Sequence, residues 1–359
     1  MTAPVPSTTG AIDCDVHIAV PNTGVLLPYL DEHWREHVSV RGIDDLELTY
    51  ERTKSPIACR PDWRPAKGKP GSSLDALRST VLDGFAVKTA ICNVMWGGMG
   101  LHAADLSAAL CRAVNDWVAE NWLDKDTRLR ASISIPLEHP HEAAAEIERC
   151  AADKRFVQVL LLAMGDAPLG KQQYWPIYEA AERHGIAIGI HAGTTYRQAP
   201  TSMGWPSYYI EDYVSQASGM QGQLLSLVYE GVFAKFPNLR VVLSESGISW
   251  LPSFLWRADK TWRGLRMEVP WVKQTPSQII RDHVRLTLRP LDAPDDAETL
   301  KKVVEQLGND DMLLFATDYP HWHFDGDLAI PEGFDPELLN KMMFVNPLDA
   351  YPRLKEKSQ

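Results

Sequence analysis

The chain has 359 residues, of which 45% are hydrophobic and 23% charged, and this ordinary globular composition leaves room for one large domain or two smaller ones. A formal net charge of −11 argues against the basic surface that nucleic-acid-binding proteins use. The five cysteines have no paired spacing and no apolar run is long enough to cross a bilayer, so we expect a cytoplasmic protein without a disulfide scaffold or a membrane span.

The predicted elements begin after a polar tail, residues 1–10, which we expect to be flexible. The first strand is predicted over residues 12–17 (IDCDVH), because polar and apolar residues alternate there. The section 39–72 is rich in proline, glycine, arginine and lysine, and it predicts a loop inserted after the first strand. Such a loop either closes over a site or covers a subunit interface.

Seven further strands are predicted, and a helical pattern separates each from the next. They cover residues 87–94, 129–135, 156–162, 186–191, 239–245, 284–288 and 312–318. Eight strand–helix units predict a (β/α)8 TIM-type barrel, with residues 11–359 as a single domain. The alternative is an open, doubly wound sheet, but residues 18–24 (IAVPNTG) lack the glycine-rich phosphate-binding turn that usually follows its first strand.

The first strand carries an unusual row of side chains. Because alternate residues of a strand point to opposite faces, we expect Asp13, Asp15 and His17 to share one face. The fifth strand places small residues below His191 in the same way, which leaves room for its imidazole inside the barrel.

Ionisable side chains stand at the ends of four predicted strands. Asp15 and His17 end the first, His191 the fifth, Glu245 the sixth and Asp318 the eighth. The C-terminal ends of barrel strands meet on the face that carries active sites, and carboxylates with imidazoles suit one divalent transition metal there. We therefore expect Asp15, His17, His191 and Asp318 to bind a metal. The alternatives are a core histidine at 191 and a helix-capping carboxylate at 245.

Three segments carry a resemblance to a known family: residues 174–193 (YWPIYEAAERHGIAIGIHAG), 233–252 (FAKFPNLRVVLSESGISWLP) and 313–321 (LLFATDYPH). They resemble the amidohydrolase superfamily, and more closely its amidohydrolase-2 branch, which contains 2-amino-3-carboxymuconate-6-semialdehyde decarboxylase. The resemblance implies a (β/α)8 barrel with one divalent metal, usually zinc.

The resemblance also implies roles for single residues. His17 and His191 match metal ligands of the family, and Asp318 matches a residue that is both ligand and acid/base group. Asp15 stands where the family usually has the first of two histidine ligands, and some decarboxylases of the branch have a glutamate there. Asp13 is expected to contact Asp15 without binding the metal. Glu245 stands where many relatives have a catalytic histidine. The additional carboxylate makes manganese an alternative to zinc.

Two reactions fit this centre. The leading expectation is a hydrolase in which a metal-activated water attacks an amide, ester or lactone, with Asp318 taking the proton and Glu245 placing the water. The alternative is a non-oxidative decarboxylase of an aromatic or unsaturated acid, in which Asp318 protonates the carbon that loses CO2. A metal-free binding or scaffold protein is a third possibility, which metal analysis would distinguish.

The loops after the strands supply the expected substrate-binding residues. They are His321 and Trp322 after the eighth strand, Tyr196 and Arg197 after the fifth, and Trp96 after the second. Arginine suits a carboxylate and tryptophan suits a flat ring. We expect a small-molecule substrate and a homodimer, with no nucleic-acid or membrane partner.

Overall fold

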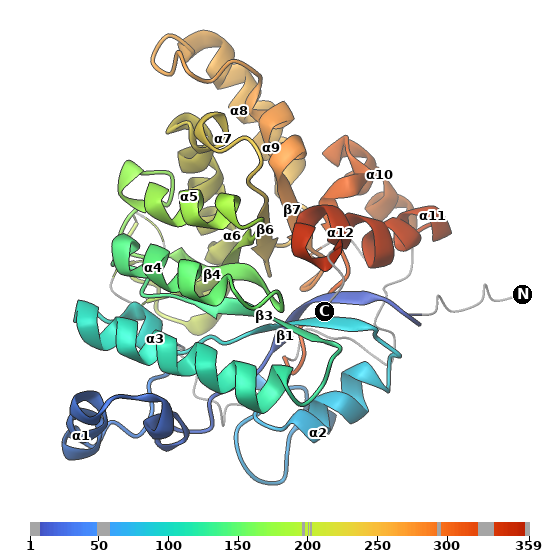
Figure 1. The fold of residues 1–359 in the computed structure, drawn as a ribbon. Helices are drawn as coiled ribbons and strands as arrows, with labels where there is room; N and C mark the ends of the chain where they lie inside the picture. Colours follow the sequence, from blue (N-terminus) through green and yellow to red (C-terminus); the bar gives the residue numbers. More distant parts are fainter. Residues whose placement is uncertain are drawn as a thin grey trace, which may run out of the picture.

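The computed structural model describes residues 8–48, 58–195, 198–199, 201, 203–292, 296–321 and 334–355. Eight parallel strands form one sheet in the order of the sequence, and helices follow them on the outside (Figure 1). The strands are β1 (Ile12–His17), β2 (Thr89–Asn93), β3 (Leu129–Ser134), β4 (Phe156–Met164), β5 (Ala187–Thr194), β6 (Val241–Ser244), β7 (Val284–Thr287) and β8 (Leu313–Leu314). The predicted (β/α)8 barrel is confirmed, and the open sheet is excluded.

The barrel closes between β1 and the residues that follow β8. Val16 and Tyr319 form a parallel bridge. The N–H of Asp318 donates to the carbonyl of Asp15 at 3.1 Å, and the N–H of His17 donates to the carbonyl of Tyr319 at 2.7 Å. Regular pairing of β8 ends at Leu314, earlier than predicted, because the last part of this strand is joined to β1 by single hydrogen bonds.

Helices cover the outside of the barrel. They are α1 (Glu32–Arg41), α2 (Leu74–Leu77), α3 (Ala104–Val118), α4 (Pro140–Cys150), α5 (Trp175–Arg183), α6 (Tyr209–Tyr229), α7 (Val232–Lys235), α8 (Leu251–Leu265), α9 (Pro276–His283), α10 (Ala297–Leu307), α11 (Pro336–Asn340) and α12 (Asn346–Ala350). Figure 1 shows α3, α4 and α5 stacked along one side. No described helix has both the length and the apolar character needed to span a bilayer.

The two faces of β5 show how the core is divided. Ile188 and Ile190 pack into the large apolar cluster under the helices, whereas Ala187 belongs to a small cluster inside the barrel. That inner cluster also contains Tyr351, from the segment after α12, so the C-terminal part of the chain contributes to the barrel interior. Buried Arg353 anchors this segment by donating hydrogen bonds to four backbone carbonyls.

The described part of the inserted section, residues 39–48 and 58–72, lies against the C-terminal ends of β1 and β8. The ring of Trp63 packs against that of Tyr319 at a tilt of 40°, with 5.3 Å between centroids. Gly71 has a left-handed backbone (φ +74°), and a Cβ there would lie 2.6 Å from the carbonyl oxygen of His17, so the chain passes β1 at a distance that only glycine allows. This section therefore borders the face where the predicted ligands lie.

Candidate metal centre

A β-bulge in β1 changes which of its side chains face inward. The three steps from Asp13 to Val16 match only two steps along β2. The additional residue leaves Asp15 and His17 inside the barrel but turns Asp13 to the other side. The prediction that all three share a face is therefore wrong for Asp13.

Asp13 instead links β1 to the residues that follow β8, where the barrel closes. Its carboxylate accepts hydrogen bonds from the N–H and the hydroxyl of Thr317, at 3.0 and 2.6 Å, and one from the N–H of Asp15 at 3.3 Å. Complete burial outweighs these hydrogen bonds and raises the pKa of Asp13 to about 7. Asp13 thus supports Asp15 through the backbone.

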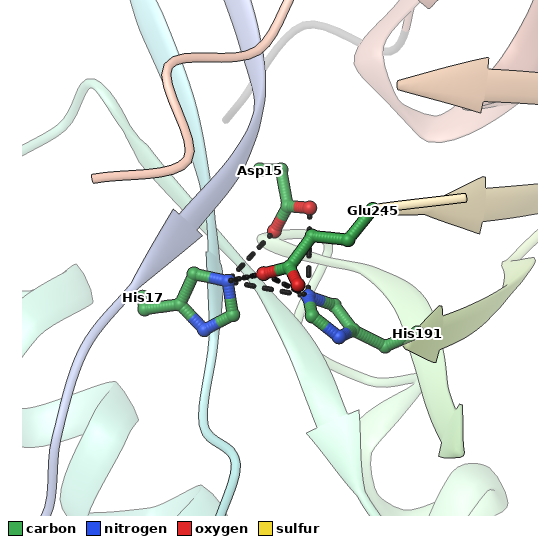
Figure 2. Close-up of side chains that lie close together, drawn as sticks. All are labelled: Asp15, His17, His191 and Glu245. Atoms are coloured by element: carbon green, nitrogen blue, oxygen red, sulfur yellow. Dashed lines mark hydrogen bonds and ion pairs between the residues drawn. The ribbon is translucent and has the colours of Figure 1, made fainter. Parts of the chain in front are cut away.

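Side chains from three strand ends meet inside the C-terminal end of the barrel (Figure 2). His17 Nε2 lies 3.4 Å from Asp15 Oδ1, 3.3 Å from Glu245 Oε1 and 3.2 Å from His191 Nε2. His191 Nε2 lies 3.5 Å from both Asp15 Oδ2 and Glu245 Oε1. The expectation that these strand ends converge agrees with the structure, and Glu245 points into the group rather than capping a helix.

Asp318 and His321 complete the group on the side of β8. Asp318 Oδ1 lies 3.2 Å from His17 Nε2 and 2.8 Å from His321 Nδ1. His321 Nδ1 also lies 3.2 Å from Glu245 Oε1, and its ring centroid is 4.2 Å from that of His17. His321 was expected to contact the substrate, and the structure places it among the ionisable groups.

The orientation of the donor atoms fits a metal ion. Asp15 Oδ2, Glu245 Oε1 and Asp318 Oδ2 are buried and accept no hydrogen bond from the described residues. His191 Nδ1 donates a hydrogen bond to the carbonyl oxygen of Ala192 at 2.7 Å. In the neutral imidazole, Nε2 therefore carries the lone pair and presents it to the inside of the barrel. Ligands about 2.1 Å from one ion lie about 3.0–3.4 Å from each other, which is close to the observed separations. Unsatisfied buried carboxylate oxygens are costly, and a cation would remove that cost.

Without an ion, the carboxylates and imidazoles balance each other. Burial favours the neutral form of His191, but the charges of Glu245 and Asp15 outweigh it and raise the pKa of His191 to about 9. Burial likewise opposes the charged form of Glu245, yet the neighbouring imidazoles of His191, His17 and His321 hold the pKa of Glu245 well below its usual range. Such strongly perturbed groups in one cluster indicate a functional site.

Backbone strain is concentrated at the same place. Glu245 (φ +55°) and Asp318 (φ +57°) both adopt the left-handed conformation that non-glycine residues avoid, at a typical cost of about 1–3 kcal/mol each. The N–H of Glu245 donates to the hydroxyl of Thr287 at 3.1 Å, and that of Asp318 donates to the carbonyl of Asp15. These bonds hold the two strand ends in turns that direct the carboxylates inward.

Of the other residues expected to bind substrate, the structure describes only Trp96. Trp96 is buried in the outer apolar cluster, and its indole N–H points to Asp45 Oδ1 at 3.4 Å. Tyr196, Arg197 and Trp322 lie outside the described residues. Tyr213 of α6, which was not predicted from the sequence, lies close enough to the cluster that the charges of Glu245 and Asp318 raise its pKa, in addition to the effect of burial.

Three buried polar residues inside the barrel were not predicted from the sequence: Asn93 of β2, Ser132 of β3 and Gln158 of β4. Asn93 donates a hydrogen bond to Asp15 Oδ1 at 2.7 Å. The sequence did contain one indication of these polar residues, because Gln158 interrupts an otherwise apolar strand.

Comparison with known proteins identifies a family. A family model described as amidohydrolase matches residues 12–353. A gamma-resorcylate decarboxylase of Rhodococcus jostii (strain RHA1) is 24% identical over 272 residues, covering 70% of this chain and 82% of that protein.

Solved structures of similar fold include two decarboxylases with bound manganese. The dihydroxybenzoic acid decarboxylase of Polaromonas sp. JS666, with manganese and the inhibitor 2-nitroresorcinol, has a TM-score of 0.67 at 18% identity, covering 97% of this chain and 98% of that one. The 5-carboxyvanillate decarboxylase of Novosphingobium aromaticivorans, with manganese and 4-hydroxy-3-methoxy-5-nitrobenzoic acid, has a TM-score of 0.71 at 18% identity, covering 96% of both chains.

The leading expectation from the sequence, a hydrolase, is wrong. The curated relative and both solved structures carry names of decarboxylases, the reaction given as the alternative. The ligand cluster alone did not distinguish the two reactions, because the same donor atoms serve both.

Proposed function

The chain belongs to the amidohydrolase family, and we propose that it is a metal-dependent decarboxylase of an aromatic carboxylic acid that works without an oxidant. The observation that carries the proposal is the carboxylate-rich cluster of Asp15, Glu245 and Asp318 with its imidazoles, in a chain whose relatives are named decarboxylases. Each carboxylate cancels part of the charge of a bound cation and weakens it as an activator of water. Such a centre can still chelate an acid, and the names of the relatives favour this use.

The proposed metal ligands are Asp15, His17, His191 and Asp318. Their oxygen-rich donor set suits a hard ion such as manganese better than zinc, and manganese is the ion in two similar structures. When bound, the ion would attract the carboxylate of the substrate and a neighbouring oxygen, and withdraw electron density from them.

Asp318 is the group that we propose as the proton donor. Decarboxylation breaks the bond between the ring carbon and the carboxyl carbon, so that CO2 leaves while the electron pair stays on the ring carbon, which then takes a proton. Asp318 lies at the strand end within 2.8 Å of His321 Nδ1, which can return a proton to it. Glu245 Oε1 lies 3.3 Å from His17 Nε2 and 3.2 Å from His321 Nδ1, and we propose that its charge helps to position these two imidazoles.

The burial of the cluster favours a small, flat substrate. Asp15 and Asp318 are fully buried, and we therefore propose that the substrate is a small acid. Tyr213 keeps its proton, because burial raises its pKa, and is a candidate donor to a ring substituent. The pocket wall proposed from the sequence also stays a proposal: Trp96, Tyr196, Arg197, His321 and Trp322. The homodimer and the cytoplasmic location stay predictions.

A substrate panel tests the proposal. Purified protein loaded with Mn2+ is given 2,6-dihydroxybenzoate, 5-carboxyvanillate and other hydroxybenzoates, and in parallel aryl esters, lactones and amides. We expect CO2 release from at least one hydroxybenzoate, and deuterium at the vacated ring position when the solvent is D2O. Hydrolysis of an ester, lactone or amide without CO2 release from any acid would overturn the proposal.

A further inference from the structure

A row of neutral polar side chains crosses the inside of the barrel from β4 to β1, and we infer that Asn93 within it is a positioning residue for Asp15. The row consists of Gln158 on β4, Ser132 on β3 and Asn93 on β2, and it ends on Asp15 of β1. Four neighbouring strands contribute one side chain each. The inference rests on the proposed function, because it assumes that Asp15 binds the metal.

The hydrogen bonds of the row are short and shielded from water. The Ser132 hydroxyl donates to Asn93 Oδ1 at 2.5 Å, and Asn93 Nδ2 donates to Asp15 Oδ1 at 2.7 Å. Gln158 Nε2 donates to Ser132 Oγ at 2.9 Å and approaches Asn93 Oδ1 at 3.3 Å. The three polar residues are at most 2% exposed, so water does not compete for these bonds.

The bonding pattern fixes which way the amide of Asn93 faces. Two donors, from Ser132 and Gln158, converge on its oxygen, so its NH2 group must face Asp15. Asp15 Oδ1 is therefore held by a neutral donor that leaves the negative charge of the carboxylate intact. The other oxygen, Oδ2, accepts no hydrogen bond from the described residues and faces His191 Nε2 at 3.5 Å. One oxygen is fixed, and the other is presented to the proposed metal.

A purely structural role does not explain this row. Barrel interiors are normally filled by branched apolar residues, and burying polar groups is costly unless every group is satisfied. Gln158 Oε1 is buried without a hydrogen-bond partner among the described residues. Gly189 of β5 makes room for the row, since a Cβ there would lie 2.4 Å from the Gln158 side chain. Strands β4 and β5 thus carry a polar residue and a glycine where branched apolar residues would otherwise pack. This is expected if the row positions the metal ligand Asp15.

Asn115 offers a matched control. It is another buried asparagine whose Nδ2 donates to a carboxylate at 2.7 Å, here Glu146 Oε1, while its Oδ1 accepts from the N–H of Ser134 at 2.8 Å. It lies on α3 and makes none of its hydrogen bonds to the metal cluster. Asn115→Leu therefore removes the same kind of interaction at a place where only stability should respond.

The test is a Mn2+ titration of metal-free protein, followed by the electron paramagnetic resonance signal of free Mn2+. We expect Asn93→Leu to weaken Mn2+ binding about 10–100-fold, the usual effect of removing a group that orients a metal ligand. Asn115→Leu should lower the midpoint of urea unfolding and leave Mn2+ affinity at the wild-type value. If Asn93→Leu does not fold, Ser132→Ala takes its place, with an expected weakening of about 3–10-fold.

The outcomes separate the inference from its premise. Wild-type Mn2+ affinity in Asn93→Leu, or in Ser132→Ala if that variant is needed, would overturn the inference while leaving the proposed metal site intact. Equal weakening in Asn93→Leu and Asn115→Leu would also overturn it, because the effect would then follow from general loss of stability. A wild-type protein that binds no Mn2+ would overturn the proposed function itself.

Discussion

Changing Glu245 to glutamine should destabilise the metal-free protein in a pH-dependent way. Glu245 Oε1 lies 3.3 and 3.5 Å from the Nε2 atoms of His17 and His191, and 3.2 Å from His321 Nδ1. Burial disfavours a charged imidazole at His191, but the negative charges of Glu245 and Asp15 outweigh burial and raise its pKa to about 9. Glutamine keeps the size of the side chain and removes the charge that has the larger effect on the pKa of His191.

The size of the effect follows from the pKa. A rise from about 6.5 to about 9 corresponds to about 3 kcal/mol of stabilisation by the protonated imidazole. We assign roughly half of this, about 1–2 kcal/mol, to Glu245. Because the pKa of His191 is higher in the folded state, this stabilisation is complete below about pH 6.5 and disappears as the pH rises through about 9.

The assay is urea unfolding of chelator-treated wild-type and Glu245→Gln protein at about pH 6 and about pH 10. We expect the variant to be less stable by about 1–2 kcal/mol at the lower pH, with a much smaller difference at the higher pH. Glu148→Gln is the control, since Glu148 pairs with His184 on the surface at 2.5 Å and should contribute less than about 1 kcal/mol. An equal loss at both pH values, or none at pH 6, would refute the reasoning.

Three further changes test other parts of the structure. Asp318→Asn should abolish CO2 release and weaken Mn2+ binding, because an amide neither delivers the proton nor supplies the charge; turnover within tenfold of wild type would contradict this. Arg353→Met should lower the free energy of unfolding by about 2–4 kcal/mol with Mn2+ affinity unchanged, since it leaves backbone carbonyls of the barrel unsatisfied; calorimetry and the Mn2+ titration check it. Asp126 accepts hydrogen bonds from Arg128 and Arg78, which lower its pKa, so Asp126→Asn should cost about 2 kcal/mol at neutral pH. Unfolding at several pH values should show this difference shrinking only as the pH falls below about 4.

The sequence predicted the barrel and the meeting of its strand ends because both follow from side-chain periodicity. His191 lies inward above Ala187 as the alternation of β5 required, and the ionisable strand ends converge because parallel strands of a barrel end on the same face. These features depend only on the chain order of strands and on which residues alternate.

Features that depend on how strands are aligned with each other were missed. The bulge that separates Asp13 from Asp15 is a matter of backbone register between β1 and β2, and side-chain alternation carries no trace of it. The contact between Asn93 and Asp15 could be predicted only if the register between β1 and β2 were known, because the two residues lie 78 positions apart in the sequence. The reaction was missed for another reason, since the same ligands serve water activation and chelation of an acid.

The central claim is that CO2 release depends on one divalent metal in this cluster, and one titration tests it directly. Metal-free protein is titrated with Mn2+ while CO2 release from the best hydroxybenzoate of the panel is measured, for the wild type and for His191→Ala. We predict that wild-type activity is absent at the start, rises with added Mn2+ and saturates at one ion per chain, while His191→Ala stays inactive at the same concentrations. CO2 release by the metal-free wild type, or by His191→Ala at the wild-type rate, would contradict the account.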